Sequence, residues 1–291
     1  MGEFIPTNPF TTSLHIVYYL TNTPTCRGGT LMKQWNGLLK KEWVTLKWPL
    51  LVSALLGIIV MSFVPHLIAN IFGLEVHVFE VVLVICFIWA GASVLAPVIA
   101  LFIMLEREIK RPDVWFHSTA SIFKLVGAKA FFASLIGAVG LLIPTLVLAV
   151  QHVLFSSTMA TFDDLFFFGS IFIVMIFAVS IIFMSIGFFF WVIDRLMKPY
   201  LKGFSIVATI IIFLVASRLY SLFVLSELYE KLILIGPIDL MKIKNPKINV
   251  DFIYLEHAET FFYTGEIVFD IFFTFIMFII AAVLFEKKVR L

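Results

Sequence analysis

The chain has 291 residues, of which 62% are hydrophobic and only 14% charged, and its formal net charge is +2. Its mean hydropathy is +1.07, and a water-soluble domain of this length needs far more polar surface to cover its core. The composition therefore excludes a soluble globular domain and predicts an integral membrane protein. Its 2 cysteines exclude a disulfide framework, because Cys86 lies inside an apolar run.

The first residues do not follow the pattern of the rest. They contain no basic segment followed by an apolar core and a small-residue cleavage site, so they do not resemble a signal peptide. Arg27-Gly28-Gly29 can be encoded by a ribosome-binding sequence a few codons before Met32, where a well-patterned helix begins. We therefore expect residues 1–31 to be a non-native or disordered leader and 32–291 to form a single transmembrane domain. The alternative is a genuine short N-terminal extension.

Six apolar stretches are long enough to cross a bilayer, which takes about 20 residues of helix. They run over approximately 49–71, 78–105, 130–156, 165–193, 203–225 and 265–285. Pro65, Pro97 and Pro144 lie within three of these stretches, where we expect kinks that neighbouring helices accommodate. The sequence therefore predicts an all-α integral membrane protein with six transmembrane helices.

The distribution of Lys and Arg predicts the orientation, because cytoplasmic loops retain basic residues. Most of the basic residues precede the first span, lie between spans two and three or four and five, or follow span six. Both termini are therefore expected in the cytoplasm of a cell-membrane protein. The short turns 72–77 and 157–164 and the long segment 226–264 are expected outside.

A helical period precedes the first span, in "MKQWNGLLKKEWVTLKW". One arc of this predicted helix carries Trp35, Leu38, Leu39, Trp43 and Leu46, and the opposite arc carries Lys33, Lys40, Lys41 and Lys47. An apolar arc with Trp, facing a lysine-rich arc, favours a helix that lies in the plane of the inner interface. The alternative is a simple N-terminal extension of span one with anchoring Trp residues.

A second amphipathic segment interrupts the apolar runs between spans two and three. Pro112 and Asp113 are suited to the first turn of a helix. One arc then carries Trp115, Phe116, Ile122, Phe123 and Val126, and the other carries Asp113, His117, Ala120, Ser121 and Lys124. We expect one face on the membrane domain and a small polar face for another partner. The alternative is an ordinary interfacial loop helix.

This combination resembles the permease subunit of bacterial type-2 ABC exporters, over Met32 to Leu291. The local similarity lies in "LEREIKRPDVWFHSTASIFKLVGAK". In that family the segment is a coupling helix that sits in a groove of the ATP-binding subunit, which implies that Pro112 to Phe123 form this helix and that Lys129 opens span three. The resemblance implies ATPase contacts at Glu106, Arg107, Glu108, Asp113, Trp115, His117, Ser121 and Lys124. The outer segment is longer than the helical hairpin of many relatives.

The motifs of nucleotide and metal chemistry are missing from the sequence. There is no G-x-x-x-x-G-K-[ST] phosphate loop, so ATP and Mg would bind to a separate ATPase. There is also no H-E-x-x-H or G-x-S-x-G, and "LEHAE" at Leu255–Glu259 fits no metal site. We therefore expect no catalytic, cofactor-binding or metal-binding residue in this chain, and no enzymatic activity of its own.

The resemblance implies a pump that moves a hydrophobic or amphipathic substrate, possibly a peptide, with two ATPase subunits and an identical or different second permease. An alternative is a non-transporting membrane scaffold that docks a cytoplasmic partner. A secondary carrier is a third reading, which the lack of buried acids along any span disfavours. Arg218, inside span five, is expected to snorkel outward or to pair with Glu227 or Glu230.

Overall fold

The computed structural model describes residues 28–73, 78–110, 122–155, 162–239 and 261–289, which are almost entirely helical. Its elements in chain order are α2 (Gly28–Phe72), α3 (Val78–Ser93), α4 (Ala96–Ile109), α6 (Ile122–Phe155), α7 (Phe162–Leu201), the 3₁₀ turn η2 (Lys202–Phe204), α8 (Ser205–Val224), α9 (Glu227–Ile233), β1 (Pro237–Asp239), β2 (Phe261–Tyr263), α11 (Thr264–Leu284) and the π-helical turn η3 (Phe285–Val289). Five helical stretches are long and apolar enough to cross a membrane. These findings support the prediction of an all-α multi-pass membrane protein.

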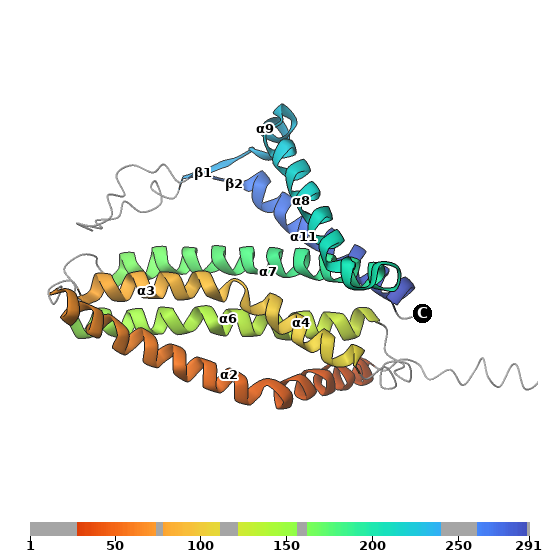
Figure 1. The fold of residues 1–291 in the computed structure, drawn as a ribbon. Coiled ribbons are helices and arrows are strands. Elements are labelled where there is room, and N and C mark those ends of the chain that lie inside the picture. The colour runs from red at the N-terminus through yellow and green to blue at the C-terminus, as the bar shows by residue number, and fades with distance from the viewer. Residues whose placement is uncertain (1–27, 74–77, 111–121, 156–161, 240–260, 290–291) are drawn as a thin grey trace, which may run out of the picture.

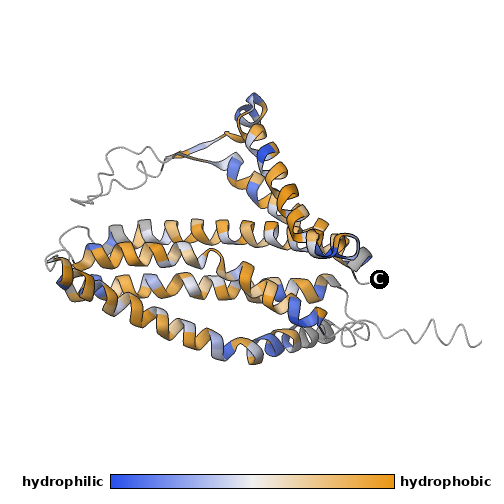
Figure 2. Ribbon diagram, viewed as in Figure 1, coloured by the Kyte–Doolittle hydropathy of each residue, from blue (hydrophilic) through white to orange (hydrophobic). Residues whose placement is uncertain are grey.

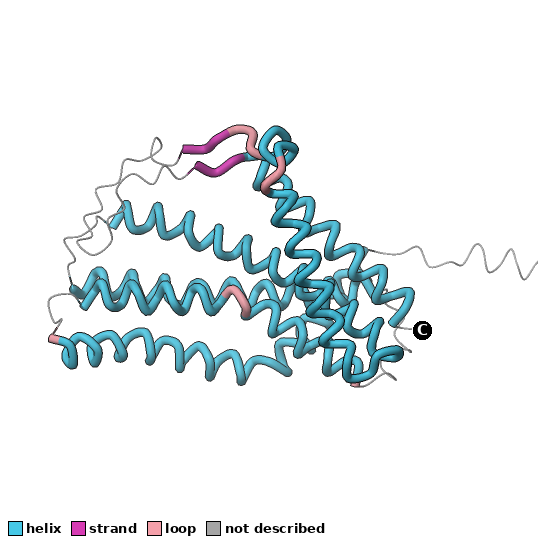
Figure 3. Tube along the Cα trace, turned by 45° about the horizontal axis from the view of Figure 1, so that its top comes forward, coloured by secondary structure: helices cyan, strands magenta, loops and turns pink. Residues whose placement is uncertain are grey.

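The long helices form two parts. Helices α2, α3, α4, α6 and α7 lie side by side as a bundle, whereas α8 and α11 lean against each other and diverge from α7 (Figures 1 and 3). One of the five apolar stretches, Gly169–Val224, is interrupted by η2 and so contains both α7 and α8. Hydrophobic residues line most of each helix, and hydrophilic residues gather where α4 ends (Figure 2).

The N-terminal amphipathic segment and the first apolar stretch form one continuous helix, α2, which begins at Gly28 and ends at Phe72. The helix continues without interruption through Pro49, which lies where the two segments meet. Figure 1 shows α2 changing direction along its length. The predicted amphipathic helix is therefore the first part of a longer one, and its position relative to the membrane plane stays a prediction.

The second predicted span is divided. Helix α3 ends at Ser93 and α4 begins at Ala96, so the chain turns over Val94 and Leu95 just before Pro97. The proline is responsible, since it has no N–H to continue the helical ladder. The hydroxyl of Ser180 on α7 donates to the carbonyl oxygen of Val94 at 2.8 Å, so a neighbouring helix satisfies a backbone carbonyl of the turn. At Pro65 and Pro144, by contrast, the helix is unbroken.

Small residues let α6 approach this break closely. A Cβ added to Gly137 would overlap the ring of Pro97, and one added to Gly140 would lie 3.5 Å from the Ser93 hydroxyl oxygen. The Ser93 hydroxyl also donates to the carbonyl oxygens of Trp89 and Gly140, at 2.9 and 3.3 Å. Close helix contact of this kind is typical of membrane proteins. Gly91, by contrast, is exposed with nothing near the position of an added Cβ.

The main hydrophobic core lies between α2, α4, α6, α7 and the end of α11. Its fully buried side chains include Leu101, Leu105, Val126, Phe188 and Phe285. A smaller core joins α2, α3 and α6 around Met61, Val82, Cys86 and Val147. The main core is therefore at the same end of the bundle as the charged end of α4.

The predicted outer segment contains a short helix, α9, and a two-stranded antiparallel sheet in which Pro237 pairs with Tyr263 and Asp239 with Phe261. The hydroxyl of Ser226 accepts the N–H of Tyr229 and so caps α9. Residues 240–260 lie outside the described part. Within the fully described helix α8, Ser205 is the one buried residue, and α11 buries only Ala281 and Ala282.

Candidate functional site

A network of charged side chains lies at the end of the bundle where α4 ends and α6 begins. Three of its members are buried: Glu42 of α2 is 7% exposed, Glu108 of α4 is 7% and Lys129 of α6 is 2%. Charged groups are rarely buried this deeply unless they are paired, because desolvation of a charge is costly. Each of these three buried charges therefore needs an oppositely charged neighbour.

Lys129 is the centre of the network. Its ammonium group donates to the carboxylate of Glu42 and, at 3.2 Å, to Oε1 of Glu108. Lys41 of α2 donates to the same oxygen of Glu108 at 2.7 Å, although half of its own side chain is exposed. Three helices, α2, α4 and α6, are thus joined by two lysines and two glutamates.

A second set of contacts extends the network to α7. Arg195 forms an ion pair with Glu106 of α4, and the indole N–H of Trp191 donates to the same carboxylate at 3.3 Å. The guanidinium also lies over the Trp191 ring, 5.2 Å from its centroid, which is the geometry of a cation–π contact. Glu106 and Glu108 therefore connect α4 to three other helices.

The local sequence explains why these charges face inward. Each lies at a helical spacing of three or four residues from buried apolar side chains, and so extends an apolar stripe by one turn. Glu42 follows Leu39 and precedes Leu46, and Glu108 follows Leu101 and Leu105. The stripes are Leu39–Glu42–Leu46 on α2, Leu101–Leu105–Glu108 on α4, Val126–Lys129–Ala133 on α6 and Phe188–Trp191–Arg195 on α7.

The network is electrically balanced, since Lys41, Lys129 and Arg195 face Glu42, Glu106 and Glu108. One donor is not satisfied within the described residues: the buried Nε of Arg195 has no hydrogen-bond partner there. An orphaned buried donor is uncommon in a settled structure. The contact between α4 and α7 is therefore less completely bonded than the contact around Lys129.

The structure brings part of the predicted site together. Glu106 and Glu108 bind other helices of this chain, and the burial of Glu108 leaves little of its side chain for a partner. Arg107 and Lys124 are exposed, on α4 and on the first turn of α6. Contact of these four residues with an ATPase stays a prediction. The other residues predicted to contact the ATPase, Asp113, Trp115, His117 and Ser121, lie outside the described residues, as does most of the segment Pro112 to Phe123.

The residues predicted for the in-plane helix have different surroundings. Lys41 belongs to the network, whereas Lys40 is exposed and Trp43 is 51% exposed. Trp35 packs against Phe131 of α6, with ring centroids 6.4 Å apart. The inward stripe of α2 therefore passes through Glu42 and Leu46, and Trp43 lies beside it.

The suggested ion pair between Arg218 and Glu227 is not formed in the part of the chain that the structure describes. Glu227 instead accepts from Lys231, one turn further along α9, at 3.1 Å. The reason is that the chain leaves α8 at Val224 and starts a new helix after Ser226, which directs Glu227 along α9. Arg218 is exposed on α8, and its snorkelling toward the outer surface stays a prediction.

Sequence reasoning did not find Glu42, Arg195 or Trp191. For Glu42 and Arg195 the signal is the spacing described above, because a charge within or at the end of an apolar stripe faces the interior and is rarely buried without a partner. Comparison of the chain with family models, curated proteins and solved structures finds no match. The assignment of a function therefore depends on the geometry.

Proposed function

We propose that this chain is the permease subunit of an ATP-driven exporter of the cell membrane. In this proposal α2, the α3–α4 pair, α6, α7, α8 and α11 make six crossings with both termini in the cytoplasm. Two separate ATPase subunits bind ATP and Mg, and a second permease completes the pathway for a hydrophobic or amphipathic substrate, possibly a peptide. The chain itself catalyses no reaction.

The charged network is the observation that supports this proposal best. Helices α4 and α6 flank residues 111–121, which contain most of the coupling helix predicted over Pro112 to Phe123. The network joins the last turn of α4 and the first turns of α6 to α2 and α7 through Glu106, Glu108 and Lys129. A displacement of the 111–121 segment by a partner would therefore move four helices together.

The network can transmit a displacement from helix to helix because buried ion pairs resist separation. Removing one partner leaves an uncompensated charge, which typically costs about 3–5 kcal/mol. A force applied at the ends of α4 and α6 is thus transmitted to the neighbouring helices before the pairs part. The core below the network, around Leu105, Val126 and Phe188, is closely packed and moves with it.

The test is to purify the tagged full-length chain from its natural membrane in mild detergent and to identify what co-purifies. We expect an ATPase with nucleotide-binding motifs. We also expect the charge reversals Asp113→Lys and Lys124→Glu to reduce its ATP hydrolysis in the complex severalfold. Lys231→Glu, an exposed charge reversal on α9, is the matched control and leaves hydrolysis unchanged.

The opposite result is also informative. If the purified chain retains other partners but no ATPase, the pump proposal fails and a scaffold that docks a cytoplasmic protein replaces it. If an ATPase is present but is equally active with all three variants, then the 111–124 segment is not its coupling contact.

A further inference from the structure

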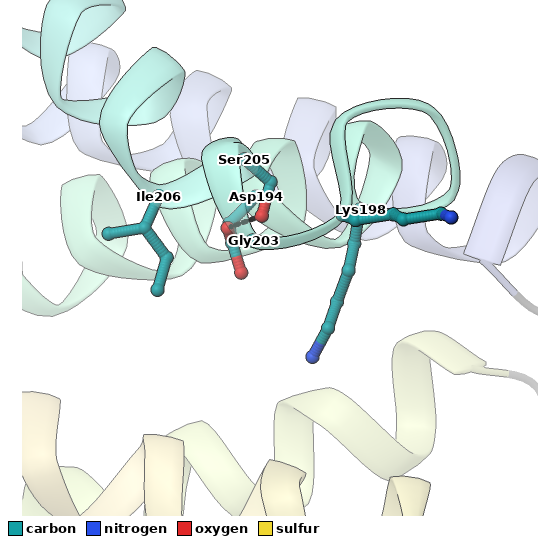
Figure 4. A pocket seen from close by; sticks show the side chains of 6 residues that line it. Asp194, Lys198, Gly203, Ser205 and Ile206 are labelled. Carbon is teal, nitrogen blue, oxygen red and sulfur yellow. Dashed lines mark hydrogen bonds between the residues drawn. The ribbon is translucent and has the colours of Figure 1, made fainter.

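A cavity of about 480 Å³ lies where the chain turns from α7 into α8. Its lining residues are Asp194, Lys198, Lys202, Gly203, Ser205 and Ile206. Figure 4 shows their side chains as sticks; Asp194 and Ser205 lie side by side, and the two lysine side chains run outward in different directions. None of these residues takes part in the charged network, although Asp194 is next to Arg195 in sequence.

The backbone of the turn has an unusual conformation. Lys202 has φ of 48°, in the left-handed region, and among the described residues it is the one non-glycine residue with a positive φ. A side chain with a Cβ is disfavoured there, and such conformations often occur at functional sites. The following Gly203 has open space around it. This turn holds Lys198 and Lys202 at the same opening.

The charges that line the cavity favour an anion. The lining contains two lysines and one carboxylate, and that carboxylate is already engaged, since the buried hydroxyl of Ser205 donates to Oδ1 of Asp194 at 2.8 Å. Helix α8, which has 20 residues, begins at Ser205, so the positive end of its dipole is also at the cavity. A phosphate group has the size and charge to be bound here.

The surroundings indicate the source of that phosphate. Tyr200 is 86% exposed and Phe204 is 75% exposed, and Ile206 next to them is 61% exposed. Aromatic and aliphatic side chains that alternate with lysines are typical of the boundary between headgroups and hydrocarbon. A soluble anion or an acidic protein surface would leave these apolar side chains uncovered, whereas the acyl chains of a lipid pack on them.

We propose that this cavity binds the headgroup phosphate of an anionic phospholipid. The flexible side chains of Lys198 and Lys202 supply the positive charge that pairs with the phosphate, and the acyl chains lie along Phe204 and Ile206. A bound lipid would connect the end of α7 to the start of α8 at their turn. The inference requires only that the chain is a membrane protein, and it does not depend on the transport function.

The test uses native mass spectrometry of the full-length chain in detergent. The probes are phosphatidylglycerol and phosphatidylcholine with identical acyl chains. A basic residue near a membrane surface contributes about fivefold to the binding of anionic lipid. We therefore expect Lys198→Gln combined with Lys202→Gln to weaken phosphatidylglycerol binding roughly 25-fold and to leave phosphatidylcholine binding unchanged. Lys231→Gln, an exposed lysine on α9, is the matched control and changes neither.

A second variant separates lost binding from lost folding. Lys198→Arg combined with Lys202→Arg keeps both charges, and we expect it to retain phosphatidylglycerol as the wild type does. Elution volume and denaturation midpoint are measured for every variant. If the glutamine variant is misfolded, the comparison is made with Lys202→Gln alone, for which we expect a loss of roughly fivefold.

Several results would overturn the proposal. The two lipids could bind equally to the wild type, or the glutamine variant could bind phosphatidylglycerol as well as the wild type does. Complete displacement of the lipid by millimolar inorganic phosphate would assign the cavity to a free anion. Loss of a co-purifying protein with unchanged lipid binding would assign the two lysines to a protein contact.

Discussion

The bundle end around Lys129 and the hairpin of α8 and α11 differ in how they are held together. At the bundle end, α2, α4 and α6 share buried ion pairs above a closely packed core, and a partly exposed pair joins α7 to them. In the hairpin, most side chains are exposed, and the two helices meet through aromatic contacts such as Tyr220 with Phe273 and Phe223 with Phe269. The comparison teaches that charge pairing and packing hold the first region together more tightly than the second.

The second region has a different role. Its exposed apolar surface is suited to lipid or to another membrane-embedded chain. It is held to the bundle through α7, against which both α11 and α8 pack. The two regions are joined near η2 and at the end of α11, where Ala281, Ala282 and Phe285 enter the main core. We therefore expect substitutions at the bundle end to affect the stability of the whole protein, and substitutions in the hairpin to act more locally.

The largest effect is expected for Lys129→Met. It leaves Glu42 and Glu108 buried without their shared cation, so the free energy of unfolding should fall by about 3–5 kcal/mol. The measurement is a titration with a denaturing detergent. Lys124→Met, at an exposed position on the same helix, is the control and should change the free energy by less than about 0.5 kcal/mol. A stable Lys129→Met protein would show that the network does not hold the helices.

The next effect compares two phenylalanines. Phe188 is fully buried in the main core, whereas Phe223 in the hairpin is 37% exposed. Phe188→Ala should lower the free energy of unfolding by about 3–5 kcal/mol, because it leaves a cavity among packed helices. We expect Phe223→Ala to cost less than half as much in the same titration. Equal losses would contradict the division into a tight and a loose region.

A smaller effect is expected at the close contact between α6 and the start of α4. Gly137→Val places a side chain where the ring of Pro97 lies, and such overpacking costs about 1–3 kcal/mol. Gly91→Ala, with nothing near its Cβ, should be neutral or slightly stabilising. If the valine variant is as stable as the wild type, α4 and α6 can separate without loss.

The smallest effect concerns Tyr229, on α9 beside the hairpin. Burial, and next the charge of Glu266, raise the pKa of the Tyr229 hydroxyl to about 12, and this hydroxyl lies 3.4 Å from Oε1 of Glu266. An unfolded chain ionises this group near pH 10. The folded protein should therefore lose stability as pH rises from about 10 to 12, since the unfolded state then binds fewer protons.

Spectrophotometric titration of tyrosinate checks this value. The wild type should show a component with a midpoint near 12 that Tyr229→Phe removes. The same substitution should flatten the dependence of stability on pH in that window. If Tyr229→Phe instead removes amplitude near pH 10, then Tyr229 is open to water and the hairpin is looser than the structure indicates.

Much of the architecture could be predicted from the sequence. The apolar runs predicted helices that the structure contains, with ends that mostly lie within a few residues of the predictions. The exceptions have clear causes. Amphipathic stretches at Trp35 and Ile122 continue helically into the adjacent apolar runs, so α2 and α6 begin well before the predicted spans. Pro97 divides a single predicted span into α3 and α4.

The candidate site was predicted only in part. Glu106, Glu108, Lys41 and Lys129 all stood out in the sequence, but as surface or boundary charges. Glu42 did not stand out, because a carboxylate among lysines is usually part of a solvated helix face. Its partner is 87 residues away in the chain, and no local period reports a contact of that range.

The sequence by itself determined that this is a helical membrane protein, because hydropathy and length are local properties that each segment carries alone. It also determined which stripe of each helix is apolar, and hence that charges such as Glu108 extend a buried face. Only the tertiary structure decided which charges meet: Lys129 with Glu42 and Glu108, and Arg195 with Glu106. The physical reason is that pairing depends on how the helices are rotated and placed against one another, and packing across the whole bundle sets that geometry.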